Sequence, residues 1–382
     1  DQTSAGQQED RSNQSPLDLT AIRAIQDMAR PTFELVPNLN SDSDSLYAKQ
    51  EEATRDQYAF IDIFNSNERV LCNGGAGSGK TFLALETAVR ASIQGQQVLM
   101  VCRNPALASF LRLKAKDSLV RITSIDDLPT SESSDLLIVD EGQDLMTMEY
   151  LDLLDRCLNG GLENGNWAIF YDHHNQSGVY DNFDPDALSI LESASQVRAP
   201  LTRNLRNTHP IVLQTKLLTG ADLGTASAGA GPSVGYNYYK NRNDAAAALN
   251  DQLNLWLDND IAPGDITILS PVSREISCVA LLGAGGDRIR TLDGDFGSSF
   301  PYQELTFCDI AGFKGLENRF VALVDLDTIE SLGASLSSLY VGMTRARAGL
   351  WLSINQSISG QVESLQLSNI DTISGERESP HD

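Results

Sequence analysis

One glycine-rich segment has the residue types and spacing that suit phosphate binding. Residues 74–81 read Gly74-Gly75-Ala76-Gly77-Ser78-Gly79-Lys80-Thr81 and satisfy the pattern G-x-x-x-x-G-K-[ST]. Glycines let backbone N–H groups wrap around phosphate oxygens, and the amino end of a following helix adds a favourable dipole. The pattern predicts that Lys80 reaches the β- and γ-phosphates of a nucleotide and that Thr81 is a ligand of Mg²⁺.

A pair of carboxylates further along the chain could complete such a site. The aliphatic run 136–139 is followed directly by Asp140-Glu141-Gly142-Gln143-Asp144. Parallel sheets bind ligands at the carboxyl ends of their strands, so these side chains are expected near the glycine-rich loop. We expect Asp140 to hold Mg²⁺ and Glu141 to be the general base that activates water. Alone, an Asp-Glu pair is more often a solvated turn; the loop upstream favours catalysis.

The hydrophobic pattern predicts the scaffold that positions these residues. Apolar runs typical of buried strands, at 70–72, 98–101, 136–139 and 167–171, alternate with amphipathic stretches at 80–93, 105–115 and 145–158. A second series has strand candidates at 234–239, 265–269, 304–308, 320–324 and 350–354, and helix candidates at 208–218, 243–257 and 334–347. Alternation of this kind predicts an α/β fold with parallel sheets flanked by helices.

Composition suggests the domain limits. Residues 1–50 are rich in Gln, Ser, Asp and Asn and are expected to form a flexible linker or N-terminal extension. We expect the first lobe at 51–196, the second lobe at 197–355 and a flexible tail at 356–382. The first residue is Asp1, so we expect either an engineered or a processed fragment.

The overall charge limits the classes of function. Acidic residues number 52 and basic residues 28, giving a net charge of −24. This opposes broad, nonspecific nucleic-acid binding but allows a local basic surface. The five cysteines form no C-x-x-C pair and there are four histidines, which argues against a zinc site or a disulfide framework and suits the cytoplasm. No apolar run is long enough for a membrane span, so no membrane partner is expected.

Further segments occur in an order that resembles a known family. The chain resembles a superfamily 1 helicase of the UvrD/Rep type from Gln57 to Leu352. Residues 140–144 resemble D-E-A-Q-D, with Gly142 in place of Ala, and 170–176 (FYDHHNQ) resemble the segment that contains G-D-x-x-Q. Residues 201–208 (LTRNLRNT) resemble L-x-x-N-x-R-S-T, 314–317 are K-G-L-E, and 339–346 (LYVGMTRA) resemble L-Y-V-A-x-T-R-A.

The resemblance implies a two-lobed ATPase. It implies two RecA-like P-loop NTPase lobes that bind ATP and Mg²⁺. Roles follow from it for Gln57 (adenine), Glu317 (ribose), Gln143 and Gln176 (γ-phosphate), and Arg206 and Arg345 (arginine fingers from the second lobe). In the segment 98–108, Arg103 and Asn104 are expected to touch the nucleic-acid backbone, and Tyr180 is expected to stack on a base.

The spacing also departs from the family. The interval from Pro105 to Asp140 leaves no room for the family's usual first-lobe accessory domain. The interval from Arg206 to Lys314 is mostly taken up by the second lobe itself, so the second accessory domain is expected to be absent or vestigial. We therefore expect a compact ATP-dependent motor on single-stranded DNA, with RNA as a possible substrate and a nuclease as a possible partner domain or subunit. One alternative is a nucleotide-driven switch that binds protein partners without unwinding DNA. A weaker alternative is a small-molecule P-loop kinase, which the paired arginines disfavour.

Overall fold

The computed structural model describes residues 58–128, 133–172, 183–292, 303–328 and 334–376. The extension expected at residues 1–50 lies outside these ranges, as do the expectations for Gln57, Gln176 and Tyr180. In the described part of the chain, no helix is both long and apolar enough to cross a membrane.

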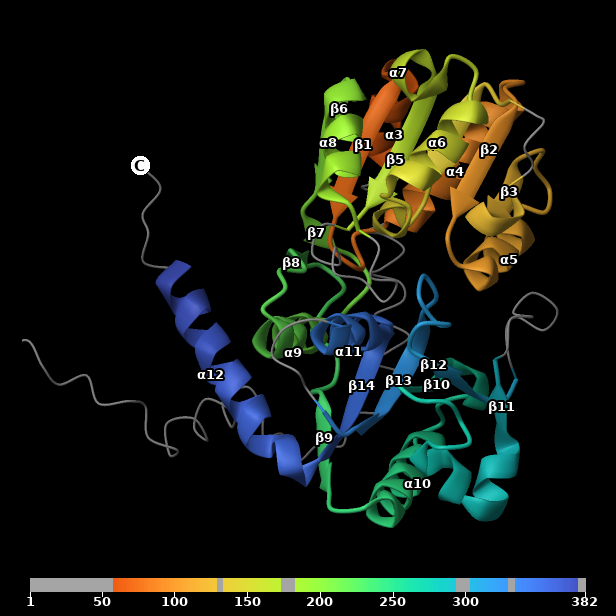
Figure 1. The fold of residues 1–382 in the computed structure, drawn as a ribbon. Coiled ribbons are helices and arrows are strands. Elements are labelled where there is room, and N and C mark those ends of the chain that lie inside the picture. Colours follow the sequence, from red (N-terminus) through yellow and green to blue (C-terminus); the bar gives the residue numbers. More distant parts are fainter. Residues whose placement is uncertain (1–57, 129–132, 173–182, 293–302, 329–333, 377–382) are drawn as a thin grey trace, which may run out of the picture. The chain divides into compact units, whose positions relative to one another are not determined.

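The first sheet is parallel and has the strand order β3-β2-β4-β5-β1-β6 (Figure 1). Its strands are β1 (Arg69–Gly74), β2 (Val98–Cys102), β3 (Arg121–Ser124), β4 (Leu136–Val139), β5 (Asn166–Tyr171) and β6 (Val197–Leu201). Its helices are α3 (Tyr58–Ser66), α4 (Lys80–Ile93), α5 (Pro105–Lys114), α6 (Met148–Arg156), α7 (Gly161–Asn164) and α8 (Pro185–Ala194). Only β5 separates β1 from β4, so the glycine-rich loop and the carboxylates of 140–144 emerge near each other at one edge.

Side chains of the first sheet alternate between two hydrophobic cores. On β2, Met100 packs with the residues of α3, α4 and α5, whereas Leu99 and Val101 pack with those of α6, α7 and α8. The same alternation on β4 sends Ile138 to the first core and Val139 to the second. Helices therefore cover both faces, which explains why these strands read as continuous apolar runs.

The second sheet is also parallel and has the order β11-β12-β10-β13-β14-β9. Its strands are β9 (Gly235–Tyr239), β10 (Ile266–Ser270), β11 (Ile289–Thr291), β12 (Leu305–Asp309), β13 (Asn318–Leu326) and β14 (Ala346–Asn355). Its helices are α9 (His209–Thr219), α10 (Arg242–Asp258), α11 (Ala334–Thr344) and α12 (Ser359–Glu376). The short strands β7 (Arg203–Asn204) and β8 (Thr225–Ala226) pair with each other.

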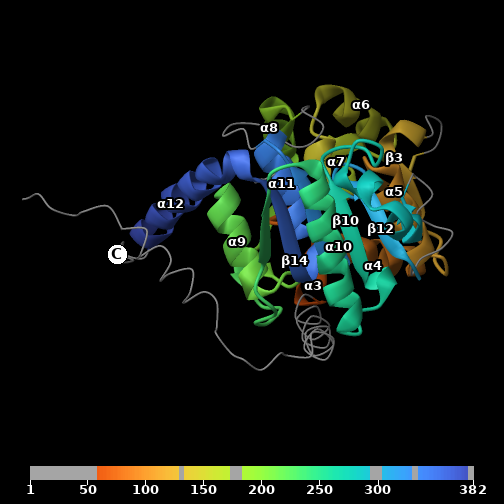
Figure 2. The same ribbon diagram turned by 90° about the horizontal axis from the view of Figure 1, so that it is seen from below.

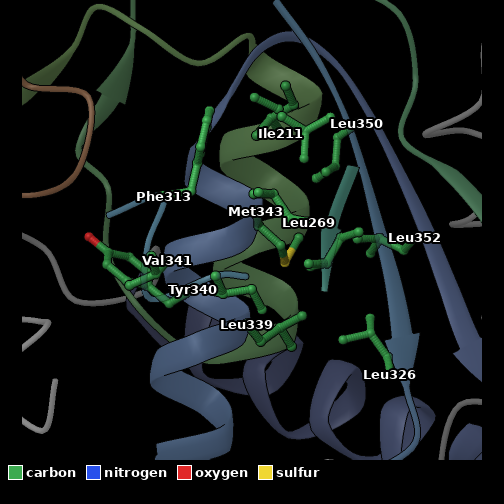
Figure 3. Packing of buried hydrophobic residues seen from close by; sticks show 14 of the residues in the cluster. Ile211, Leu269, Phe313, Leu326, Leu339, Tyr340, Val341, Met343, Leu350 and Leu352 are labelled. Atoms are coloured by element: carbon green, nitrogen blue, oxygen red, sulfur yellow. The ribbon is translucent and has the colours of Figure 1, made fainter. Parts of the chain in front are cut away.

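Two cores also flank the second sheet. Figure 2 shows α9 and α10 on opposite sides of β14. Leu350 and Leu352 of β14 face α9 and α11 in the core drawn in Figure 3, whereas Trp351 packs with the residues of α10. The predicted α/β class with parallel sheets flanked by helices is thus confirmed.

The chain after β14 differs from the sequence-based expectation. A loose tail is expected at 356–382, yet a short 3-10 turn (Gln356–Ile358) and helix α12 occupy residues 356–376. Val362 is fully buried in the core shared with α9, and the Asn369 side chain donates a hydrogen bond to the carbonyl of Leu217 at 2.9 Å. The segment lacks aromatic residues, but a few aliphatic side chains suffice to attach a helix to an existing core.

Val362→Ala should lower the free energy of unfolding by about 2 kcal/mol, because two buried methyl groups are lost and a small void remains. Glu363→Ala, at the neighbouring exposed position, should change it by less than about 0.5 kcal/mol. Denaturant unfolding of both variants measures the difference. Equal stabilities would contradict the packing of α12 on α9.

Candidate nucleotide-binding site

The glycine-rich loop joins β1 to α4 and encloses the side chain of Lys80. Gly77 and Gly79 have φ angles of 80° and 88°, in the left-handed region that favours glycine. The Lys80 ammonium is buried and donates hydrogen bonds to the carbonyls of Gly74 at 2.6 Å and Gly75 at 2.9 Å. Lys80 therefore lies within the loop, where phosphate oxygens would be alternative partners for its ammonium group.

Asp140 lies at the carboxyl end of β4, next to Thr81. Its side chain is completely buried, and neither carboxylate oxygen accepts a hydrogen bond of acceptable geometry within the described residues. Burial, reinforced by the Glu141 charge, raises the pKa of Asp140 to about 7, while the nearby Thr81 hydroxyl and Lys80 act in the opposite direction. A buried carboxylate without donors is an unusual arrangement that a cation would stabilise.

The residues at this position fit Mg²⁺. A carboxylate and a hydroxyl are the hard oxygen ligands that this ion prefers, and it usually keeps waters and substrate phosphates as its other ligands. Within the described residues, no group of three or more His, Cys, Asp or Glu side chains could hold a metal on its own. Asp140 and Thr81 would therefore hold Mg²⁺ together with a nucleotide.

Glu141 adopts a backbone conformation that is rare for a residue with a side chain. Its φ is 53°, in the left-handed region, and such strain often occurs at functional sites. Burial alone would raise its pKa, but the charges of Lys314, Lys80 and Arg345 more than offset this, and the pKa of Glu141 is lowered. The carboxylate is therefore ionised at neutral pH, as a general base must be.

Gly142 follows in the position where the family pattern has Ala. A Cβ atom there would lie 2.8 Å from Cγ2 of Ile169 and 3.1 Å from the carbonyl oxygen of Phe170. A methyl group at this position would therefore require Ile169 or the backbone of β5 to shift. The departure from the family pattern has a steric explanation in the packing of this chain.

Gln143 connects Glu141 to the end of β5. Its amide nitrogen donates to the Glu141 carboxylate at 2.5 Å, and its amide oxygen accepts from the backbone N–H of Asp172 at 2.9 Å. The side chain is 3% exposed. Gln143, expected to sense the γ-phosphate, here fixes the orientation of Glu141.

A buried ion pair joins the carboxylate segment to the second sheet. Nζ of Lys314, which lies between β12 and β13, is 2.5 Å from Oδ1 of Asp144, and both side chains are almost fully buried. Burial raises the pKa of Asp144 to about 6, although the Lys314 charge opposes the shift. Removing one partner of such a pair leaves an uncompensated buried charge, so each residue depends on the other.

Arg206, one of the two expected arginine fingers, lies in a charged cluster with Glu317 and Arg347. Arg206 forms an ion pair with Glu317, and Nη1 of Arg347 lies 3.5 Å from the other oxygen of Glu317. Burial would raise the pKa of Glu317, but Arg206 and Arg347 hold it below its usual value. Glu317, expected to contact a ribose, is here a partner of two arginines.

Arg345, the other expected arginine finger, is buried close to this cluster. Its guanidinium donates to the carbonyls of Val341 and Leu316 at 3.0 and 3.2 Å. Burial and then the charge of Arg206 lower the pKa of Arg345, whereas Glu141 raises it. The structure therefore brings Arg345 within electrostatic range of both Arg206 and Glu141.

Arg103 and Asn104, which are expected to touch the nucleic-acid backbone, have partners within the chain. Asn104 caps helix α5 by accepting from the N–H of Ala106 at 2.8 Å, and its amide donates to the carbonyls of Gly312 and Lys314 at 3.1 and 2.9 Å. The guanidinium carbon of Arg103 lies 4.9 Å from the centroid of the Tyr150 ring. Asn104 thus links the first sheet to the Lys314 segment.

Several residues of this site were not assigned a role from the sequence. Asn204 donates to the carbonyl of Ala76 at 2.9 Å, and Asn207 donates to the carbonyls of Thr344 and Ala346 at 3.0 and 2.6 Å. Lys314, Asn204 and Tyr340 all lie within segments that resemble family motifs. Their positions within these motifs indicate that they belong to the site. The contacts of neutral amides and of a phenol cannot be predicted from sequence spacing.

Comparisons with known proteins give distant likenesses. No protein-family model and no curated protein matches the sequence. Among solved structures, the chain is similar to a crystal structure of Arterivirus nonstructural protein 10 (helicase), with a TM-score of 0.44 and 14% identity over 78% of this chain and 61% of that chain. It is also similar to the complex of this helicase with DNA, with a TM-score of 0.43 and 14% identity over 78% of this chain and 63% of that one. The chain thus spans less than two thirds of the length of these helicases.

Proposed function

We propose that the protein is an ATP hydrolase that acts as a motor on single-stranded nucleic acid. The observation that carries the proposal is the electrostatic environment of Glu141. This ionised carboxylate interacts electrostatically with Lys80 of the glycine-rich loop and with Lys314 and Arg345 of the second-sheet region. Phosphoryl transfer depends mainly on such positioned charges.

The proposed chemistry assigns a separate task to each group. Lys80 would exchange its loop carbonyls for phosphate oxygens. Asp140 and Thr81 would hold Mg²⁺, which would supply positive charge beside the phosphates. Glu141, fixed by Gln143, accepts a proton from the attacking water. Arg206 and Arg345 stabilise the charge that develops on the transferred group.

Because Arg345, Lys314 and Asn207 belong to the part of the chain that forms the second sheet, nucleotide binding would couple movements of the two sheets. Such coupling is what a motor requires. The nucleic-acid contacts are proposed for Arg103 and the Asn104 segment, with DNA preferred and RNA as the second candidate. A switch that binds protein partners is the competing function, because the same coupling would serve it.

Glu141→Gln should reduce kcat for ATP hydrolysis by about 10²-fold or more, the scale of positioned acid–base catalysis, while nucleotide binding persists. Glutamine can still accept the hydrogen bond from Gln143, so the fold is retained. Lys80→Ala should instead weaken nucleotide binding. Steady-state hydrolysis and titration with a fluorescent ATP analogue separate the two effects. Turnover at the parental rate in Glu141→Gln would remove the assigned base.

Arg206→Ala should lower kcat by about 10³-fold, as expected for an arginine finger, with a smaller change in nucleotide affinity. Glu317 keeps Arg347 as a partner, so the loss of Arg206 leaves no unpaired buried charge. Arg203→Ala, at an exposed position three residues earlier, is the matched control and should keep parental turnover. If both variants behaved alike, Arg206 would have no role in hydrolysis.

Single-stranded DNA should stimulate hydrolysis at low salt and lose this effect near physiological salt. The reason is that the affinity for DNA should fall by about 0.7 log units per log unit of salt for each phosphate neutralised. Blunt duplex DNA should stimulate poorly. Arg103→Ala should weaken the stimulation, whereas Lys240→Ala, which removes an exposed charge near the second sheet, should not. If neither DNA nor RNA changed the turnover of an active protein, the motor would be excluded and the protein-binding switch favoured.

A further inference from the structure

Tyr340 of α11 connects three segments that are far apart in the sequence. Its ring belongs to the hydrophobic core of the second sheet, and Figure 3 shows its hydroxyl pointing away from the neighbouring aliphatic side chains. The hydroxyl accepts a hydrogen bond from the backbone N–H of Ala76 in the glycine-rich loop at 2.9 Å. It donates one to the Asp172 carboxylate, at the end of β5, at 2.7 Å.

This contact continues to the proposed base. The backbone N–H of Asp172 donates to the amide oxygen of Gln143 at 2.9 Å, and the amide nitrogen of Gln143 donates to Glu141 at 2.5 Å. Tyr340, Asp172 and Gln143 are each 3% exposed, so water competes little for these hydrogen bonds. We call this sequence of hydrogen bonds, from Ala76 through Tyr340, Asp172 and Gln143 to Glu141, the Tyr340 relay.

The protonation state of Tyr340 suits this role. Burial, together with the negative charge of Asp172, raises the pKa of Tyr340 well above its usual value. The phenol therefore stays protonated at neutral pH, and it donates to Asp172 while it accepts from Ala76. The direction of each hydrogen bond in the relay is thus determined by the groups themselves.

We propose that Tyr340 is a positioning residue for hydrolysis, which holds Glu141 in its productive orientation through Asp172 and Gln143 and links that orientation to the glycine-rich loop. The proposal rests on the proposed function, since it assigns Glu141 as the base. Tyr340 lies in the second half of α11, and Arg345 directly follows Thr344, the last residue of that helix. A shift of α11 would therefore reach the arginine, the loop and the base together.

The test is Tyr340→Phe, which removes the hydroxyl and keeps the ring in the core. The matched control is Tyr239→Phe, because Tyr239 is also 3% exposed and donates to an aspartate, Asp327, at 2.7 Å. Tyr340→Phe should lower kcat for ATP by about 10- to 100-fold, the range for outer groups that orient a site residue, with KM changed less than about threefold. Tyr239→Phe should keep parental kcat, whatever its effect on stability.

The Glu141→Gln background shows whether Tyr340 acts through the base. If it does, adding Tyr340→Phe to Glu141→Gln should lower kcat by less than about twofold, because residues that act as a unit are not additive. A full, multiplicative loss in the double variant would overturn the relay. So would parental kcat in Tyr340→Phe when the parent is active, and in both cases the proposed hydrolysis would stand.

Amide hydrogen exchange tests the relay without hydrolysis. In the nucleotide-free protein, Tyr340→Phe should accelerate exchange of the Ala76 and Asp172 amides at least several-fold, and Tyr239→Phe should leave both unchanged. Unchanged exchange at both amides in Tyr340→Phe would overturn the relay. A parent that hydrolyses no nucleotide would refute the proposed function, and the exchange result would still decide whether Tyr340 holds these segments.

Discussion

The site depends on one constraint, which is the burial of carboxylates. Three of them lie within five residues at the end of one buried strand. Asp140, Glu141 and Asp144 lie where β4 ends, and Asp140 is entirely removed from solvent. Buried charge is unfavourable unless it is paired, ligated or neutralised by a proton. Each of the three meets the constraint differently. Asp140 has a raised pKa and, in the part of the chain that the structure describes, no donor of acceptable geometry. Glu141 lies among cations, and Asp144 pairs with Lys314.

The cationic side chains that stabilise these buried carboxylates do not come from the first sheet alone. Lys80 follows β1, but Lys314 precedes β13 and Arg345 precedes β14. The stability of the carboxylate segment and the position of the second-sheet residues are therefore coupled. A nucleotide with Mg²⁺ would add charges of both signs to the same place, so its binding and loss would change the balance that holds Lys314 and Arg345.

Neutral polar groups give this charged region its geometry. Asn204 holds the carbonyl of Ala76, Tyr340 holds the N–H of the same residue, and Gln143 holds Glu141. Hydrogen bonds of buried amides and phenols have a fixed direction and length, whereas ion pairs tolerate several arrangements. The charged side chains set the electrostatic potential at the site, and these neutral groups fix the orientation of Glu141 and of the glycine-rich loop.

The local sequence pattern was sufficient to predict the α/β class and the parallel sheets, because strand and helix periodicity is visible over short stretches of chain. It also predicted that residues 74–81 and 140–144 lie at one sheet edge. It was insufficient for α12, and for the short strands β3, β6 and β11, whose stability comes from a neighbouring strand or core. The sequence by itself thus determined which chemical groups the site contains. Only the tertiary structure decided their partners: that Glu317 meets Arg206, that Lys314 meets Asp144 and that Tyr340 reaches Ala76. Contacts between residues so far apart depend on how two sheets pack, which no local spacing encodes.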